Sequence, residues 1–128
     1  MKFLRPVLSL LLASAASLAA AGEIKPYSPT EFDKLTQAGK PVVVDVTATW
    51  CPTCKAQKPI IDSLMQQPAY RDVTLLTVDF DSNSAALKRF KVRMQSTLVA
   101  FKGEAEVGRS TGDTTAAGLE NLIKKTVD

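Results

Sequence analysis

Residues 42–55 read Val-Val-Val-Asp-Val-Thr-Ala-Thr-Trp-Cys-Pro-Thr-Cys-Lys, and this stretch decides the fold. The run at 42–46 is mostly β-branched and apolar, which predicts a buried strand. A helix is expected to begin at the cysteine segment and to run towards Gln66. A buried strand followed directly by a helix is typical of α/β folds. We therefore expect Cys51 and Cys54 to lie at the amino end of a helix.

Outward from this stretch, the chain alternates between helix and strand signals. Ser28 and Glu31 form a capping box with Pro29 between them, and Gly39 ends the helix that they begin. Pro59 is expected to kink the helix that carries the cysteines. Further strands are predicted at 73–80, 97–101 and 106–110, the last two as a hairpin around Gly103, and further helices at 84–90 and 114–125. The order predicts one α/β domain, with a central mixed β-sheet and helices on both faces.

The amino-terminal segment differs in composition from the rest of the chain. Lys2 and Arg5 precede an apolar run and an alanine-rich stretch that ends at Ala21, which is the pattern of a secretory signal peptide. The alternative is a retained membrane anchor, but the apolar stretch is shorter than the ~20 residues that a bilayer requires. We expect residues 1–21 to be a signal peptide and residues 22–128 to form the mature domain in the periplasm.

Charge and residue inventory exclude several function classes. Without Lys2 and Arg5, the 16 basic residues fall to 14 against 13 acidic residues, so the net charge falls from +3 to +1. A nearly neutral domain argues against a nucleic-acid partner. The chain has no histidine, which excludes Cys–His catalysis and histidine-ligated metals within it. Two cysteines do not complete a four-cysteine site, so no metal and no separate cofactor are expected.

The spacing of the two cysteines predicts redox chemistry. Helix N-termini carry unpaired N–H groups and a partial positive charge, which stabilise a thiolate at Cys51. Disulfide exchange needs that thiolate and a second thiol nearby to resolve the mixed disulfide, and Cys54 lies one turn later. The alternative is a disulfide that only stabilises the fold, but a loop this short gives little stabilisation.

With these features in place, the sequence resembles the thioredoxin family over essentially all of residues 23–128. Asp45, six residues before the first cysteine, matches the family's buried acid, and Pro59 matches its kinking proline. Residues 97–103 match its closing hairpin. The resemblance implies a thioredoxin-like fold and a thiol–disulfide oxidoreductase that acts as a monomer on protein thiols and disulfides.

Candidate site residues follow from the motif and from the resemblance. A carboxylate within a valine run is costly to bury, so the pKa of Asp45 is expected to be raised. The alternative is a strand that ends early and leaves Asp45 solvated. The resemblance gives Asp45 the role of assisting proton transfer at Cys54.

The catalytic candidates are therefore Cys51, Cys54 and Asp45, and the substrate-binding candidates are Trp50, Pro52, Thr53, Gln95, Ser96 and Thr97. Trp50 either shields the cysteines and contacts partners or only packs.

Two positions depart from the family's pattern. Ser96 stands where the family has a cis-proline, and a cis bond before a non-proline residue costs about 3 kcal/mol, so the Gln95–Ser96 bond is expected to be trans. We expect residue 96 to affect partner docking more than the thiolate pKa of Cys51. Thr77 stands where thioredoxins usually have a lysine near the buried acid, so proton transfer is expected to be weaker or arranged differently.

The residues between the cysteines bear on the direction of the reaction. Strong periplasmic oxidases have a histidine there, whose charge stabilises the thiolate, whereas Thr53 is neutral. The resemblance therefore favours a reductase that receives electrons from a membrane-bound thiol donor. The alternatives are a net thiol oxidase and a non-catalytic binding module that captures partners or a metal cluster.

Overall fold

The computed structural model describes residues 20–128. The predicted signal peptide therefore lies almost wholly outside the described residues. Between residues 20 and 128, none of the helices combines the length and apolarity needed to cross a bilayer.

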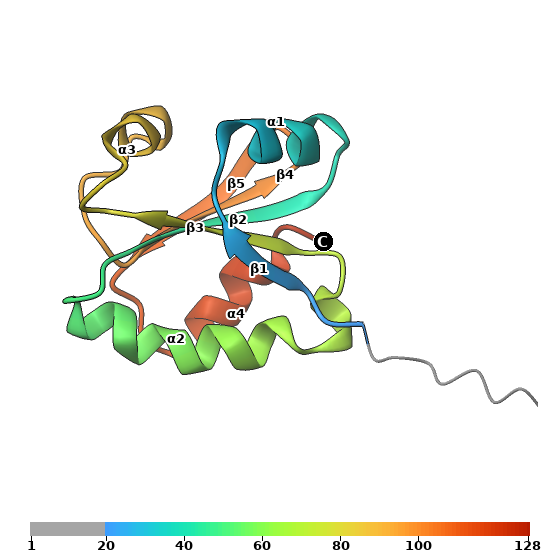
Figure 1. Cartoon of the computed structure of the whole chain (residues 1–128). Helices are drawn as coiled ribbons and strands as arrows, with labels where there is room; N and C mark the ends of the chain where they lie inside the picture. Colours follow the sequence, from blue (N-terminus) through green and yellow to red (C-terminus); the bar gives the residue numbers. More distant parts are fainter. Residues whose placement is uncertain (1–19) are drawn as a thin grey trace, which may run out of the picture.

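The described chain folds into a five-stranded mixed sheet with helices on both faces, as predicted. The elements are β1 (Glu23–Pro26), α1 (Pro29–Gln37), β2 (Pro41–Thr47), α2 (Pro52–Met65), a 3₁₀ turn (Pro68–Tyr70), β3 (Thr74–Asp79), α3 (Ser84–Phe90), β4 (Thr97–Lys102), β5 (Ala105–Thr111) and α4 (Ala116–Lys124). The strand order is β1-β3-β2-β4-β5. β3 pairs in parallel with β1 and β2, whereas β4 pairs antiparallel with β2 and β5. Figure 1 shows α1 and α3 on one face of the sheet and α2 and α4 on the other.

Among the strands at residues 20–128, β1 is the one that the sequence pattern did not predict; the 3₁₀ turn at Pro68–Tyr70 was not predicted either. The four residues of β1, Glu-Ile-Lys-Pro, include three that are exposed, so no apolar run or alternation marks them. The strand forms because its backbone pairs with β3 along one edge of the sheet. Backbone pairing at the edge of a sheet needs no apolar side chains, so the apolar pattern of the sequence did not predict this strand.

Alternation along β2 divides the core into two layers. Val42, Val44 and Val46 pack towards α1 and α3, whereas Val43 packs towards α2 and α4. Because successive side chains of a strand point to opposite faces, Asp45 shares the face of Val43. The strand therefore directs a carboxylate towards the helix that carries the cysteines.

The described domain begins at a tightly packed glycine. The backbone N–H of Gly22 donates to the carbonyl oxygen of Met65, the last residue of α2, at 2.7 Å. A Cβ atom at position 22 would lie 2.6 Å from Met65 Cε, 2.7 Å from the Tyr70 oxygen and 2.9 Å from the Val73 oxygen. Such distances leave no room for a side chain, so only glycine fits between the end of α2 and the start of β3.

Candidate active site

The cysteine pair lies at the amino end of α2, as predicted. Cys51 is the N-cap residue and Pro52 opens the helix, where its missing N–H costs nothing. The Cys51 sulfur takes the place of the usual capping oxygen and accepts the backbone N–H of Cys54 at 3.1 Å. Both cysteines are free thiols. Local helix capping therefore holds the two sulfur atoms on one side of the first turn.

Both thiols are covered by their neighbours. Cys51 is 1% exposed and Cys54 is 6% exposed, and they pack with Ala48 and Phe80. A substrate sulfur that bonds to Cys51 must therefore displace part of the surrounding surface.

Ser96 contacts both sulfur atoms. Its Oγ lies 3.1 Å from the Sγ of Cys51 and 3.1 Å from the Sγ of Cys54. The Gln95–Ser96 peptide bond is trans, as predicted. The expectation that residue 96 would affect docking more than the thiolate stays a prediction, and the structure adds a direct contact of this side chain with the reacting atoms.

The environment of Cys51 lowers the pKa of its thiol. Burial raises the pKa, but hydrogen bonds from the Cys54 side chain, the Ser96 hydroxyl and the backbone N–H groups of Cys54 and Thr53 outweigh burial. Donors of this kind stabilise the thiolate more than the neutral thiol. Cys51 is therefore prepared to act as a nucleophile.

Asp45 is buried on the face of the sheet that α2 covers. It is 9% exposed, and strand β2 continues past it to Thr47, so the alternative of a solvated aspartate is wrong. Burial raises the pKa of Asp45 to about 6, although the charge of Lys58 acts in the opposite direction. Its Oδ1 atom has no hydrogen-bond partner among the described residues. A carboxylate of this kind is able to take up a proton near neutral pH.

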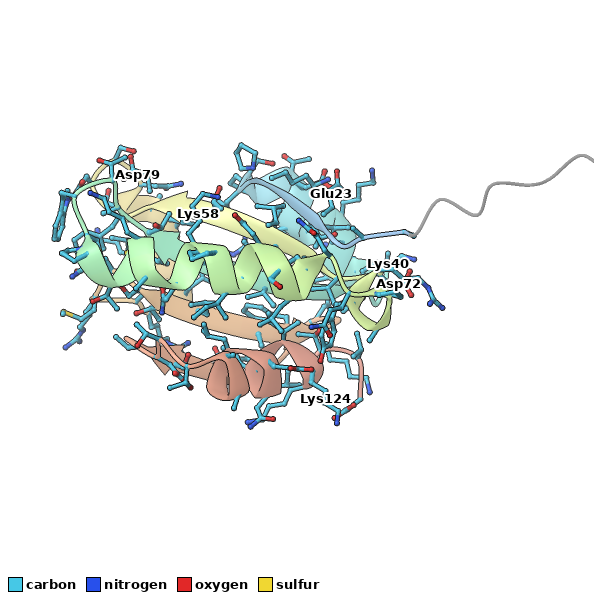
Figure 2. The ribbon with its side chains drawn as sticks, turned by 90° about the horizontal axis from the view of Figure 1, so that it is seen from below. Glu23, Lys40, Lys58, Asp72, Asp79 and Lys124 are labelled. Atoms are coloured by element: carbon cyan, nitrogen blue, oxygen red, sulfur yellow. The ribbon has the colours of Figure 1, made fainter. Side chains whose placement is uncertain are left out.

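A cavity connects Asp45 with the second cysteine. Its volume is about 510 Å³, and its lining includes Asp45, Cys54 and Lys58. Figure 2 shows Lys58 on α2 and Asp79 at the end of β3 on the same side of the molecule, and both residues line this cavity. Asp45 and Cys54 therefore line the same cavity.

The predicted substrate-binding residues differ in their accessibility. Trp50 is 54% exposed, and its Nε1 donates to Asp81 Oδ2 at 2.7 Å, so the ring is held at the surface and is not part of the core.

Of the other predicted substrate-binding residues, Pro52 is exposed, Thr53 and Gln95 are half-buried, and Ser96 and Thr97 are buried. The Thr97 hydroxyl donates to the Met94 carbonyl oxygen at 2.8 Å, so the Thr97 side chain points inward and is not available to a substrate.

Two residues of the site were missed by sequence reasoning. Gln57 is 1% exposed, and its Nε2 donates to the carbonyl oxygens of Asp113 at 2.8 Å and Ser96 at 3.4 Å. Its signal was present, because Gln57 interrupts the buried face of α2 formed by Cys54, Ile61 and Leu64. Lys58 gave no comparable signal, since its role depends on the cavity that it shares with Asp45.

Between residues 20 and 128, no group of three or more potential ligands is placed to hold a metal ion.

Comparisons with known proteins agree with the geometry. The Thioredoxin family model matches residues 23–125. The chain is 37% identical to Thioredoxin-2 of Saccharomyces cerevisiae over 91 residues, which is 70% of this chain and 86% of that protein. It is 30% identical to a thioredoxin of Coprinus comatus over 97 residues, 76% of this chain and 91% of that protein. The crystal structure of Trxlp from Edwardsiella tarda EIB202 is similar with a TM-score of 0.77 and 42% identity, covering 79% of this chain and 98% of that one. A dithiol at a helix N-terminus on this fold thus has one consistent interpretation: the chain belongs to the thioredoxin family and is a thiol–disulfide oxidoreductase.

Proposed function

We propose that this protein is exported to the periplasm and reduces protein disulfides there, as a monomer that receives electrons from a membrane-bound thiol donor. The observation that carries the reaction is the shared cavity of Cys54 and Asp45 behind a thiolate-stabilised Cys51. This arrangement supplies a nucleophile, a resolving thiol and a proton acceptor in the order in which a reductase uses them.

The reaction begins at Cys51. Its thiolate attacks one sulfur of the substrate disulfide, the substrate S–S bond breaks, and the leaving thiolate takes up a proton. Cys54 then loses its proton to the Asp45 carboxylate and attacks the Cys51 sulfur. The mixed disulfide breaks, and the second substrate sulfur leaves as a thiolate that takes up the proton held by Asp45. The substrate has gained two electrons from the cysteines, one proton from the solvent and the proton of Cys54 by way of Asp45, and the Cys51–Cys54 disulfide remains for the donor thiol to reduce.

Sequence features support the direction and the location that we propose. The dipeptide between the cysteines, Pro52-Thr53, carries no charge, so it adds no cationic stabilisation to the thiolate and leaves the pair less oxidising. The basic and alanine-rich segment at 1–21 has the pattern of an export signal. Export would place the pair in an oxidising compartment, where a reductase needs an external electron source.

Two measurements test this function. Purified residues 22–128 should catalyse reduction of insulin by dithiothreitol, and a binding module without turnover would not. In periplasmic extracts that are trapped with acid and alkylated at once, Cys51 and Cys54 should be mostly reduced. A pair found mostly as the disulfide would instead favour net thiol oxidation. Absence of the protein from the periplasmic fraction would reject the proposed location.

A further inference from the structure

The Ser96 hydroxyl contacts both reactive sulfur atoms. Its Oγ is 3.1 Å from each Sγ, but a hydroxyl carries only one proton. A Cys51 thiolate can only accept, so in that state the Ser96 O–H donates to Cys51, and the single S–H proton of Cys54 is shared between Ser96 Oγ and the Cys51 sulfur. The hydroxyl thus links the protonated thiol to the charged one.

The backbone of Ser96 is held in an unusual conformation. Its φ is +61°, a left-handed value that costs a residue with a side chain about 1 kcal/mol or more. The N–H of Ser96 donates to the Val46 carbonyl oxygen at 2.8 Å, and its own carbonyl oxygen accepts the Gly112 N–H at 3.0 Å. These bonds hold a strained residue in place. The hydroxyl is therefore placed by the fold.

Gln57 adds a contact from the helix that carries the cysteines. Its side-chain amide donates to the Ser96 carbonyl oxygen at 3.4 Å and to the Asp113 carbonyl oxygen at 2.8 Å. Gln57 lies one turn after Cys54 on α2 and is 1% exposed. Because one rigid helix carries both groups, Gln57 fixes the Ser96 segment relative to the sulfur atoms.

We propose that Ser96 is a catalytic hydrogen-bond donor to the Cys51 thiolate, that Gln57 is its positioning residue, and that together they favour the dithiol form over the disulfide. In the disulfide both sulfur atoms are neutral and carry no proton, so the bonds to Ser96 weaken on oxidation. The Ser96 proton is not transferred at any step. The inference rests on the proposed function and names the residues that set the equilibrium of the pair: a stabilised dithiol makes the pair more oxidising, so Ser96 and Gln57 act against the neutral Pro52-Thr53 dipeptide and increase the need for the electron donor.

The test is to remove the hydroxyl in two ways. Ser96→Ala removes it and keeps the cost of the left-handed backbone, whereas Ser96→Gly removes it and relieves that cost. In equilibrium with a glutathione buffer, both variants should shift about tenfold towards the disulfide, which is about 30 mV for a two-electron couple. The ultraviolet absorbance of the thiolate, followed against pH, should show a higher Cys51 pKa in both variants. Shifts below about twofold in both variants would overturn the role of Ser96.

Gln57 is tested with a variant of similar volume. Gln57→Met removes the amide donors, and the equilibrium should move in the same direction by about threefold. The matched controls are Gln67→Met, an exposed glutamine just beyond α2, and Thr111→Val, whose hydroxyl lies 3.0 Å from Thr97 Oγ1. Neither control should move the equilibrium. If Gln57→Met lowers the melting temperature but leaves the equilibrium unchanged, Gln57 is structural and its positioning role is wrong.

The wild-type insulin assay separates the two proposals. If the wild type reduces insulin while Ser96→Ala and Ser96→Gly keep the wild-type equilibrium, only the Ser96 inference fails. If the wild type has no activity, the proposed function fails whatever the variants do.

Discussion

Lys58 of α2 and Asp45 of β2 line the same cavity, and the positive charge of Lys58 opposes the rise that burial imposes on the pKa of Asp45. Lys58 also bonds to Asp62 Oδ2 at 2.9 Å, one helical turn along α2. Besides Asp45 and Lys58, the charged residues around this cavity are Lys55, Asp62 and Asp79. Lys58 of α2 thus supplies a positive charge near Asp45, whereas the neighbouring strand β3 has the neutral Thr77 beside Asp45.

Removing the charge of Lys58 should move the pH profile of the reaction. In Lys58→Gln the Asp45 carboxylate loses its favourable neighbour, so its pKa should rise further above 6. The low-pH limb of the rate of insulin reduction should then shift to higher pH. Lys55→Gln, from the same cavity, is the matched control and should keep the wild-type profile. An unchanged pH profile in Lys58→Gln would mean that Lys58 does not influence proton transfer.

Asp45→Asn should stabilise the reduced protein at neutral pH. The folded-state pKa of about 6 lies above the ordinary value of 3.8, so between these values the folded protein binds more protons than the unfolded chain. Stability therefore falls as pH rises through this window, and the charged group costs about 3 kcal/mol at pH 7. Urea unfolding should give Asp45→Asn a free energy of unfolding about 2 kcal/mol above that of the wild type at pH 7. This gain is smaller than the cost of the charge because the buried amide still lacks full solvation. At pH 4 the gain should be much smaller. Equal gains at both pH values would contradict the assignment.

The same variant should slow catalysis. Asn cannot accept the proton of Cys54, so resolution of the mixed disulfide should fall by about a hundredfold near neutral pH. Stopped-flow measurement of the second step isolates this effect from the first attack. A rate loss confined to the first step would mean that Asp45 acts on Cys51 instead.

Cys51 and Cys54 should differ in the complexes that they trap. Cys54→Ser leaves the attacking thiol without its resolving partner, so mixed disulfides with proteins should accumulate. Cys51→Ser removes the attacking thiolate and should trap few. Non-reducing gels with mass spectrometry of the captured species provide the measurement. Equal trapping by both variants would reverse or remove the assigned roles.

Trp50 should contribute to docking and not to chemistry. Its exposed ring is held by the bond from Nε1 to Asp81 Oδ2. Trp50→Ala should raise KM for a protein disulfide several-fold, about 1 kcal/mol of lost contact, with kcat unchanged. Asp81→Ala should have a smaller effect in the same direction. A small disulfide substrate should react at the wild-type rate with both variants, and a loss there would place Trp50 in the chemical step.

The sequence predicted those features that depend on local pattern. The apolar strands, the helix that begins at Cys51 and the raised pKa of Asp45 follow from β-branched runs, capping residues and the cost of burying a carboxylate. Boundaries of these elements fall within two residues of the prediction.

Features that depend on contacts between distant segments escaped prediction. Ser96 lies 45 residues from Cys51 in the chain, and no pattern near residue 96 indicates that its hydroxyl reaches the sulfur atoms. Its left-handed backbone conformation depends on the bond that its N–H donates to Val46 and on the bond that it accepts from Gly112. Strand β1 likewise depends on pairing with β3. In each case the feature depends on contacts between segments that are far apart in the chain, and local sequence patterns do not indicate such contacts.

The packing of Gly22 gives the proposed cleavage after Ala21 an electrostatic consequence. Cleavage there would turn the backbone N–H that Gly22 donates to the Met65 carbonyl oxygen into a charged ammonium group. Met65 ends α2, where the helix dipole is negative, and a positive charge at that end stabilises the helix. Maturation would thus attach a cationic cap to the far end of the helix that carries Cys51. Gly22 is half-buried and bonded to Met65 in the folded domain, whereas Ala21 before it is exposed. Cleavage at the proposed site would therefore fasten the active-site helix, through a charged terminus, at the end opposite its chemistry.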